Sequence, residues 1–406
     1  MQIVSRVMRL KNHLNANTLR LLAFICFATP VKAQTLFNLG GDDIEIFVSD
    51  GEILTITGDL NNSGDIINAG SIFMGGNWVN NGTYNSLQGS FTLNGANEQQ
   101  ISHNGQDFFN LTINGSGNKV LESDVFVNNQ ITFENGLLSP AGDVTLFVRE
   151  NTMVMGGNET SYVNGRLAVA GTGDLFFPVG KNGNYKPLNL YNLQGTSPVL
   201  GFEVFEPNPD PQTPRELQAI SETRYWQKTQ LSGTTSGGRV ELSISEDDGL
   251  TDLFLTVVTE TDRPGEVFQN LGRSQTTGDL SNGSVTSEAF IGNGNKVYAL
   301  GQEVDLTGID CVPNAFSTLS PDREERVIKV YCSNISEDDF SFRIYDKWGL
   351  IVYETTSLEE ATQSGWNGIN SNTGNPEKND VYRYVLSGKF LNGNELSRVG
   401  TITKIN

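Results

Sequence analysis

A short internal repeat in the N-terminal third of the chain constrains the fold more than any other feature. Between residues 60 and 84 the pattern apolar-x-Asn-x-Gly-x-apolar occurs three times, at Leu60–Ile66, Ile66–Ile72 and Trp78–Tyr84. A longer pattern then ends three apolar runs with glycines 20 and 21 residues apart, at Gly95, Gly115 and Gly136. Short β runs at a period near 20 residues predict a parallel β-helix with one coil per repeat.

In such coils the apolar residues are expected to stack inward, and each corner needs residues that tolerate an unusual backbone. We therefore expect Gly to take the positive-φ corners, and Asn to tolerate them better than most residues do. The alternative is a row of β-hairpins with Asn-Gly turns that together form a sandwich. The stretch also resembles, in composition, the repetitive regions of large bacterial surface adhesins.

The whole chain is predicted to be all-β, with four segments. Residues 1–33 form a signal peptide, residues 34–170 a β-helix-like repeat region, residues 171–305 a β-sandwich, and residues 306–406 a second, C-terminal β-sandwich. The boundary near 170 follows from a change in the sequence pattern. After it, strand-like runs are joined by Gly-rich turns and, later, by a segment with four prolines between 207 and 214.

The N-terminal segment has the composition of a secretory signal. It contains five Lys or Arg residues and no acid, an apolar stretch at 21–28, and a small-residue cleavage site between Ala33 and Gln34. The apolar stretch is too short to span a membrane, and no later segment approaches 18 apolar residues. The expected product is an exported protein that is not an integral membrane protein.

Charge narrows the range of partners. The chain has 47 acidic residues against 27 basic ones, and five of the basic ones lie in the signal segment. This balance argues against nucleic acid as a partner, because phosphate binding needs clustered cations. An acidic surface favours solubility and is compatible with cation binding.

The last 65 residues carry the most specific motifs. They include Phe342–Gly349, Ile351–Glu354, Gly365–Gly368, Val381–Leu386 and Gly400–Thr403, which alternate apolar and polar residues between turn residues. The alternation places Phe342 and Ile344 on one face of a strand. This pattern resembles the gliding-motility-associated C-terminal domain, the sorting domain of proteins exported by the type IX secretion system.

The resemblance implies a β domain that the type IX secretion machinery recognises after Sec-dependent export. It assigns a structural signature to Tyr345, Trp348, Gly349, Trp366, Gly368, Pro376, Tyr382, Tyr384 and Gly400. We expect Trp348 and Trp366, like Trp226 of the middle region, to be core residues. Two family features differ here: the acidic loop after Ser317 is absent, and the usual Pro-x-Gly turn reads Pro376-Glu377-Lys378.

Beyond the signal segment the chain has two cysteines, Cys311 and Cys332. In an exported protein they could form a disulfide that closes a loop of about 20 residues, worth roughly 3 kcal/mol in the loop-entropy description. Two free thiols are the alternative, since sequence does not reveal pairing geometry.

The sequence offers little for catalysis. After residue 33 the only histidine is His103, which we interpret as a solvated turn residue, and no nucleophile elbow or phosphate-binding loop is present. The carboxylates considered for glycoside chemistry are Asp42, Asp43, Asp59, Asp65, Asp107 and Asp124. Two acids converging in a groove with a basic residue would favour an enzyme, and a smooth Asn/Gly face would favour binding. We predict no catalytic residues.

No cofactor is expected, apart from a weak case for Ca²⁺ at the acidic runs 246–248 and 337–339 and at Asp42–Asp43. Trp78 and Tyr84 could form a sugar-stacking platform, but we expect them to stack inside the coils. The chain is thus predicted to be a secreted or cell-surface non-catalytic protein, adhesive or structural, with a surface glycan or other surface proteins as partners. The alternatives are a β-helix carbohydrate-active enzyme with the same sorting domain, and a component of the gliding or adhesion machinery.

Overall fold

The computed structural model describes residues 37–39, 45–215, 217–304, 311–332, 334–390 and 395–405. The predicted signal peptide, with Ala33 and Gln34, lies outside the described residues, as do Asp42, Asp43 and the predicted boundary at 305–306. The described residues form two compact units: those up to 214 with 219–251 and 257–301 make the first, and those within 215–218, 252–256 and 302–405 make the second. In the described parts no helix is long and apolar enough to cross a membrane.

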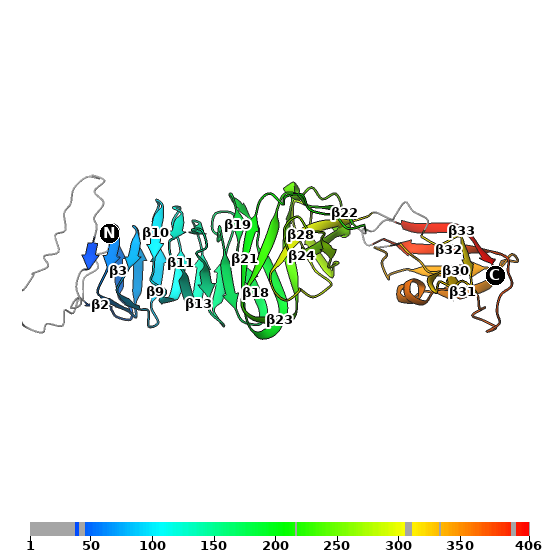
Figure 1. Ribbon diagram of the computed structural model, residues 1–406, viewed down its shortest axis with the longest axis horizontal. Helices are drawn as coiled ribbons and strands as arrows, with labels where there is room; N and C mark the ends of the chain where they lie inside the picture. Colours follow the sequence, from blue (N-terminus) through cyan, green and yellow to red (C-terminus); the bar gives the residue numbers. More distant parts are fainter. Residues whose placement is uncertain are drawn as a thin grey trace, which may run out of the picture. The chain divides into compact units, whose positions relative to one another are not determined.

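The first unit begins with a parallel β-solenoid of about six turns, which confirms the predicted β-helix and excludes a row of hairpins. Its strands stack in chain order, from blue to green in Figure 1. One sheet contains β1 (Phe37–Leu39), β4 (Leu60–Asn62), β7 (Trp78–Asn80), β10 (Gln99–Ser102), β12 (Lys119–Leu121) and β14 (Leu138–Pro140). A second contains β2 (Glu45–Val48), β5 (Asp65–Asn68) and β8 (Thr83–Asn85).

The third solenoid sheet contains β3 (Ile53–Ile56), β6 (Ser71–Met74), β9 (Ser90–Leu93), β11 (Asp107–Ile113), β13 (Val125–Phe133), β15 (Leu146–Val148), β16 (Met153–Gly156) and β17 (Leu167–Ala170). Its register follows the sequence repeat, because Phe91 lies beside Leu111, and Leu111 beside Ile131. All three side chains are buried. The 20-residue period therefore corresponds to one coil, and the repeated apolar position forms a column inside the solenoid.

The asparagines of the short repeat have a different role from the expected one. Asn62, Asn68 and Asn80 are fully buried, and they do not occupy positive-φ corners. The amide of Asn62 donates to Oδ1 of Asn80 on the next coil (2.7 Å), and that of Asn80 donates to Oε1 of Gln106 (3.0 Å). A buried amide must find partners, and stacked copies of the repeat supply them in register.

The glycines divide into two groups. Gly115 (φ 120°) and Gly136 (φ 88°) take positive φ, as expected. Gly70 and Gly82 do not; a Cβ on Gly82 would instead lie 2.1 Å from the carbonyl oxygen of Gly64 on the preceding coil. At those two positions glycine is required by the close approach of successive coils, so the positive-φ explanation was wrong there.

Antiparallel strands continue the third solenoid sheet. β17 pairs in parallel with β15 and antiparallel with β21 (Leu188–Phe205), which pairs along its length with β23 (Tyr225–Ser245). The remaining elements are β18 (Gly173–Phe177), β19 (Gly180–Lys181), β20 (Asn184–Tyr185), β22 (Leu217–Ile220), η1 (Glu246–Asp248), η2 (Leu253–Leu255), β24 (Thr256–Thr261), β25 (Gln269–Asn270), β26 (Gln275–Gly278), β27 (Asn282–Thr286) and β28 (Lys296–Glu303). Residues 171–305 are therefore rich in β-strands, as predicted, and Trp226 is buried as expected.

The second unit is built on one five-stranded sheet in the order β29 (Ala315–Ser317), β33 (Glu395–Ile405), β32 (Val381–Lys389), β30 (Ser341–Tyr345) and β31 (Ile351–Thr355). Two short helical turns accompany it, η3 (Glu324–Arg326) and η4 (Glu360–Ser364). Phe342 and Ile344 are buried on one face, as their alternation predicts. Together with Leu386 and Ile402 they form the core of this unit.

Candidate functional site

Several of the predicted signature residues form the core of the C-terminal sheet. Trp366, Tyr382 and Tyr384 are each at least 95% buried, and the rings of Trp366 and Tyr382 meet edge to face at 4.9 Å. The indole N–H of Trp366 donates to the carbonyl of Ile369 at 2.9 Å. These residues therefore have a packing role that accounts for their presence.

The glycines and the proline of the signature shape the backbone. Gly349 (φ 81°) and Gly368 (φ 80°) take positive φ, where a side chain would be strained. Gly400 lies opposite Tyr384 on the neighbouring strand, and a Cβ there would come within 2.5 Å of the tyrosine ring. Pro376 forms an isolated bridge with Ile369 that closes the turn after Gly368.

Trp348 is not a core residue, so that expectation was wrong. Its side chain is 79% exposed, at the tip of the hairpin that joins β30 to β31. Oδ1 of Asp346 accepts the backbone N–H groups of Trp348 and Leu350, both at 2.8 Å, and this fixes the turn. Leu350 is 65% exposed, so one rigid turn presents two large apolar side chains to solvent.

A groove of about 490 Å³ lies on the solvent face of the same sheet, beside this turn. Lys347, Arg383 and Tyr345 line it, and Nζ of Lys347 pairs with Asp380 at 2.7 Å. The remaining lining residues are Asp346, Gly349, Val381, Tyr382, Val385 and Thr401. Exposed apolar groups beside a groove that also carries charged side chains are typical of a surface that binds a partner.

Cys311 and Cys332 form a disulfide in the structure, with their Cα atoms 4.9 Å apart and a sequence separation of 21. Both are buried within the core of the second unit. The bond ties the segment before β29 to the segment that follows η3, and the backbone N–H of Tyr331 donates to the carbonyl of Cys311 (2.8 Å) between the same two segments.

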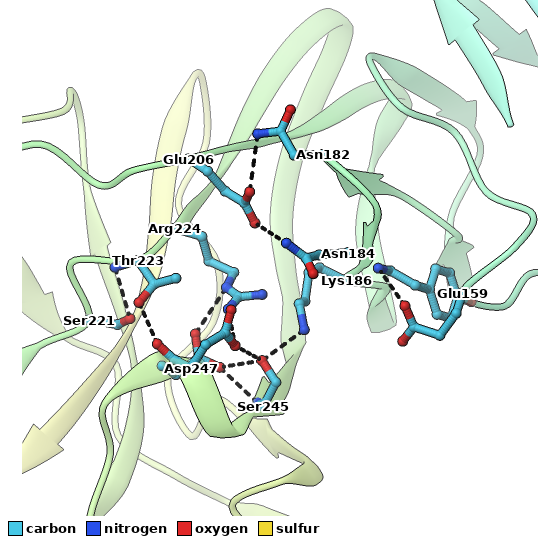
Figure 2. Close-up of polar contacts among 12 residues, drawn as sticks. Glu159, Asn182, Asn184, Lys186, Glu206, Ser221, Thr223, Arg224, Ser245 and Asp247 are labelled. Atoms are coloured by element: carbon cyan, nitrogen blue, oxygen red, sulfur yellow. Dashed lines mark hydrogen bonds and ion pairs between the residues drawn. The ribbon is translucent and has the colours of Figure 1, made fainter. Parts of the chain in front are cut away.

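A second candidate site lies in the antiparallel part of the first unit, where a polar cavity of about 220 Å³ is lined by both Lys186 and Ser245. Both residues also belong to a partly buried ion cluster, shown in Figure 2. Arg224 has no exposed side-chain area and pairs with Asp247 and, at 3.0 Å, with Asp248. Nζ of Lys186 donates to Oγ of Ser245 at 2.8 Å, and Ser245 Oγ lies 2.6 Å from Oδ1 of Asp247.

The sequence folds in this way because η1 follows directly after β23. Its backbone turn directs Asp247 and Asp248 back toward Arg224, which immediately precedes the same strand. Burial lowers the pKa of Lys186, and nearby Arg224 adds to this effect. Burial also raises the pKa of Asp248, although Arg224 opposes it. Two cations and two carboxylates are thus gathered together, and their charges compensate.

Other carboxylates considered in the sequence have structural partners. Oδ1 of Asp59 accepts the N–H of Asn77 (2.8 Å), and Oδ1 of Asp124 accepts that of Thr145 (2.9 Å), each on the next coil. Asp107 pairs with Arg149 at 3.0 Å. Asp65 starts β5 with an exposed side chain. These acids do not gather in one groove.

The acidic runs considered for Ca²⁺ are similarly engaged. Asp247 and Asp248 hold Arg224, and Asp339 pairs with Lys389 at 3.3 Å. Across the described residues, no group of three or more His, Cys, Asp or Glu side chains is arranged to hold a metal ion.

His103 is not a solvated turn residue, which corrects a second expectation. It is fully buried, stacks on Phe108 with ring centroids 3.8 Å apart, and accepts the indole N–H of Trp78 at Nδ1 (2.9 Å). Burial lowers its pKa to about 3, so the ring is neutral. Trp78 and Tyr84 are buried inside the coils as expected, and so they provide no sugar-stacking surface.

The residues of the polar cavity were missed by sequence reasoning. Glu159, Lys186 and Glu241 come from three separated segments, and no spacing connects them. Comparison with protein-family models finds no match, and no curated protein is similar to the chain.

Proposed function

We propose that the chain is a secreted or cell-surface, non-catalytic β-rich protein, adhesive or structural, which the type IX secretion machinery exports through its C-terminal unit. The proposal is supported by the different positions of the predicted signature residues. Trp366, Tyr382, Tyr384 and Gly400 build the core of a compact sheet, whereas Trp348 is held outside it.

Recognition of a folded β domain requires a surface that is rigid before binding, because ordering a flexible turn would cost affinity. The turn at Asp346–Leu350 meets this requirement through its backbone hydrogen bonds. Trp348 and Leu350 then offer apolar area with little entropy left to lose, and aromatic residues are enriched at such contacts. The secretion machinery is the proposed partner of this turn.

The solenoid supports the adhesive part of the proposal. Its interior is filled by the apolar columns and by the hydrogen-bonded pair Asn62 and Asn80. The residues that point outward repeat from coil to coil and form long regular faces. Regular stacks of this kind present extended surfaces to partners. A surface glycan or another surface protein is the proposed ligand class.

The alternative, a secreted carbohydrate-active enzyme, is favoured by one specific observation. Glu159, Glu241 and the basic residue Lys186 line the same cavity, which is the combination that would indicate glycoside chemistry. Three hydrogen bonds indicate a structural role for these side chains instead. Oε2 of Glu241 accepts from Tyr191 and from Asn189 (3.4 Å), and Nζ of Lys186 donates to Oγ of Ser245. Release of reducing sugar from neutral polysaccharides would favour the enzyme.

The export proposal is tested by localisation in a host with a working type IX system. Full-length protein should reach the surface or the medium, and a chain ending at Leu306 should stay in the periplasm. Trp348→Ala should reduce delivery while leaving the protein folded. Leu319→Ala is the matched control, because Leu319 is 72% exposed in the same unit but lies outside the signature. Normal delivery of the truncated chain would refute the proposal.

A further inference from the structure

The polar cavity of the first unit is enclosed by four parts of the chain. Tyr185, Lys186 and Asn189 come from β20, the link after it and the start of β21, and Glu241 to Ser245 form the end of β23. Ser281 to Ser284 come from the turn into β27, and Glu159 adds a rim from the loop after β16. Lys186 and Ser245 are held in place because they belong to the partly buried ion cluster seen in Figure 2.

The lining contains both hydrogen-bond donors and acceptors. Hydroxyls come from Ser243, Ser245, Ser281 and Ser284, an amide from Asn189, and carboxylates from Glu159 and Glu241. Oγ of Ser243 is buried and has no hydrogen-bond partner among the described residues. A buried hydroxyl without a partner costs free energy, so a ligand that bonds to it would be favoured. Such a wall suits a molecule that carries many hydroxyl groups.

The charges that line the cavity distinguish anionic ligands from neutral ones. Lys186 and Arg224 are balanced by Asp247 and Asp248, so the charges that remain at the cavity are the two carboxylates of Glu159 and Glu241. A phosphate or an acidic sugar would be repelled. A neutral polyol can instead donate its hydroxyl protons to both carboxylates, and charged acceptors make the stronger hydrogen bonds.

Size limits the ligand further. The cavity of about 220 Å³ is smaller than the ~300–1,000 Å³ typical of pockets for drug-sized molecules. It has room for one sugar ring and not for an extended chain. Tyr185 lines the same cavity and supplies an aromatic ring next to this space.

From these observations we infer that the cavity is a binding site for a single neutral sugar unit, such as the end of a surface glycan. The inference deepens the proposed adhesive function, because it adds one glycan site in the antiparallel part of the first unit to the extended faces of the solenoid. It rests on the proposed function only for the source of the glycan, since binding of a free sugar does not depend on export.

The test uses the purified chain without its first 33 residues and probes it with neutral monosaccharides and neutral oligosaccharides by saturation-transfer NMR and calorimetry. A uronic-acid oligosaccharide and CaCl₂ serve as comparison ligands. Glu241→Gln and Glu159→Gln keep side-chain shape and an acceptor oxygen for the existing hydrogen bonds while removing the charge. Each should weaken binding about 10-fold or more, because hydrogen bonds to charged groups are the strong ones. Glu150→Gln, an exposed acid outside the cavity lining, is the matched control and should not change affinity.

Binding of a neutral sugar that both cavity variants weaken, with the control unaffected and melting temperatures retained, supports the site. No neutral-sugar binding at millimolar concentration, equal binding by the Glu241→Gln variant, or binding of only the uronic acid or Ca²⁺ would overturn it. Hydrolysis of a neutral glycan that Glu241→Gln abolishes would support the site and refute the non-catalytic function. Failure of export would leave the site intact.

Discussion

Replacement of His103 by glutamine tests the packing of the solenoid through its pH dependence. His103 has a pKa of about 3 in the folded chain because burial disfavours its charged form, against an ordinary value of 6.5. Between pH 6.5 and 3 the unfolded chain binds a proton at this position and the folded chain does not. The stability that neutral His103 contributes is therefore fully present above pH 6.5 and is lost as the pH falls toward 3.

The magnitude follows from the shift. Each pH unit below 6.5 costs about 1.4 kcal/mol from this group, so about 3 kcal/mol is lost between pH 7 and pH 4. In the His103→Gln variant the new side chain retains an acceptor for the indole N–H of Trp78 but does not titrate. The variant is expected to be less stable at pH 7, since the stacking on Phe108 is lost, and to lose about 3 kcal/mol less than the wild type on acidification.

The assay is hydrogen exchange of the peptides covering β10 and β11, measured in increasing urea at pH 7 and pH 4. Local exchange is preferable to a single global transition because the chain has two compact units. Comparing the two proteins at each pH cancels the contributions of the other titrating groups. Equal losses for wild type and variant would refute the reasoning that a buried neutral histidine anchors these coils.

Three further predictions concern the C-terminal unit. Trp366→Ala should destabilise it by about 3–5 kcal/mol, as expected for a large buried aromatic, whereas Trp348→Ala should change its stability by less than about 0.5 kcal/mol. Urea unfolding followed by circular dichroism measures both changes. Equal effects would contradict the assignment of Trp366 to the core and of Trp348 to the surface. Gly400→Val should cost about 1–3 kcal/mol by overpacking, measured as a lower melting temperature, and an unchanged value would show that the sheet yields freely there. Reduction of the Cys311–Cys332 bond should lower stability by roughly 3 kcal/mol, and urea midpoints that are the same with and without reductant would contradict this.

The solenoid could be predicted because its determinants are periodic in sequence. Phe91, Leu111 and Ile131 repeat at the coil period, and only stacking places all three in one core. The reason for the asparagines could not be predicted in the same way. Whether Asn62 faces inward or lies at a corner depends on where each strand begins, and a one-residue difference reverses the direction of the side chain.

Exposure was predicted less well than strand position. Trp348 and Trp366 both lie in β motifs, yet one is in a turn held by Asp346 and the other is in the core. His103 lies in a polar segment, and only the neighbouring coils bury it, through Trp78 and Phe108. Local composition indicates a turn but does not report what packs over it.

The cavity residues had no sequence signal because the antiparallel pairing of long strands brings them together. Asn189 lies opposite Glu241 in the β21–β23 register, although 52 residues separate them. The buried pair of Arg224 and Asp248 likewise joins residues that flank the 21-residue strand β23. Such non-local contacts are fixed by topology, which a single sequence does not specify.

The C-terminal unit is proposed to act as an export address in its own right. Joining residues 306–406 to a periplasmic reporter that has its own signal peptide, in a host with a working type IX system, tests this. We expect the reporter to appear at the surface or in the medium, and Trp348→Ala in the fused segment to reduce this delivery. A folded fusion that stays in the periplasm, like the reporter alone, would contradict the claim.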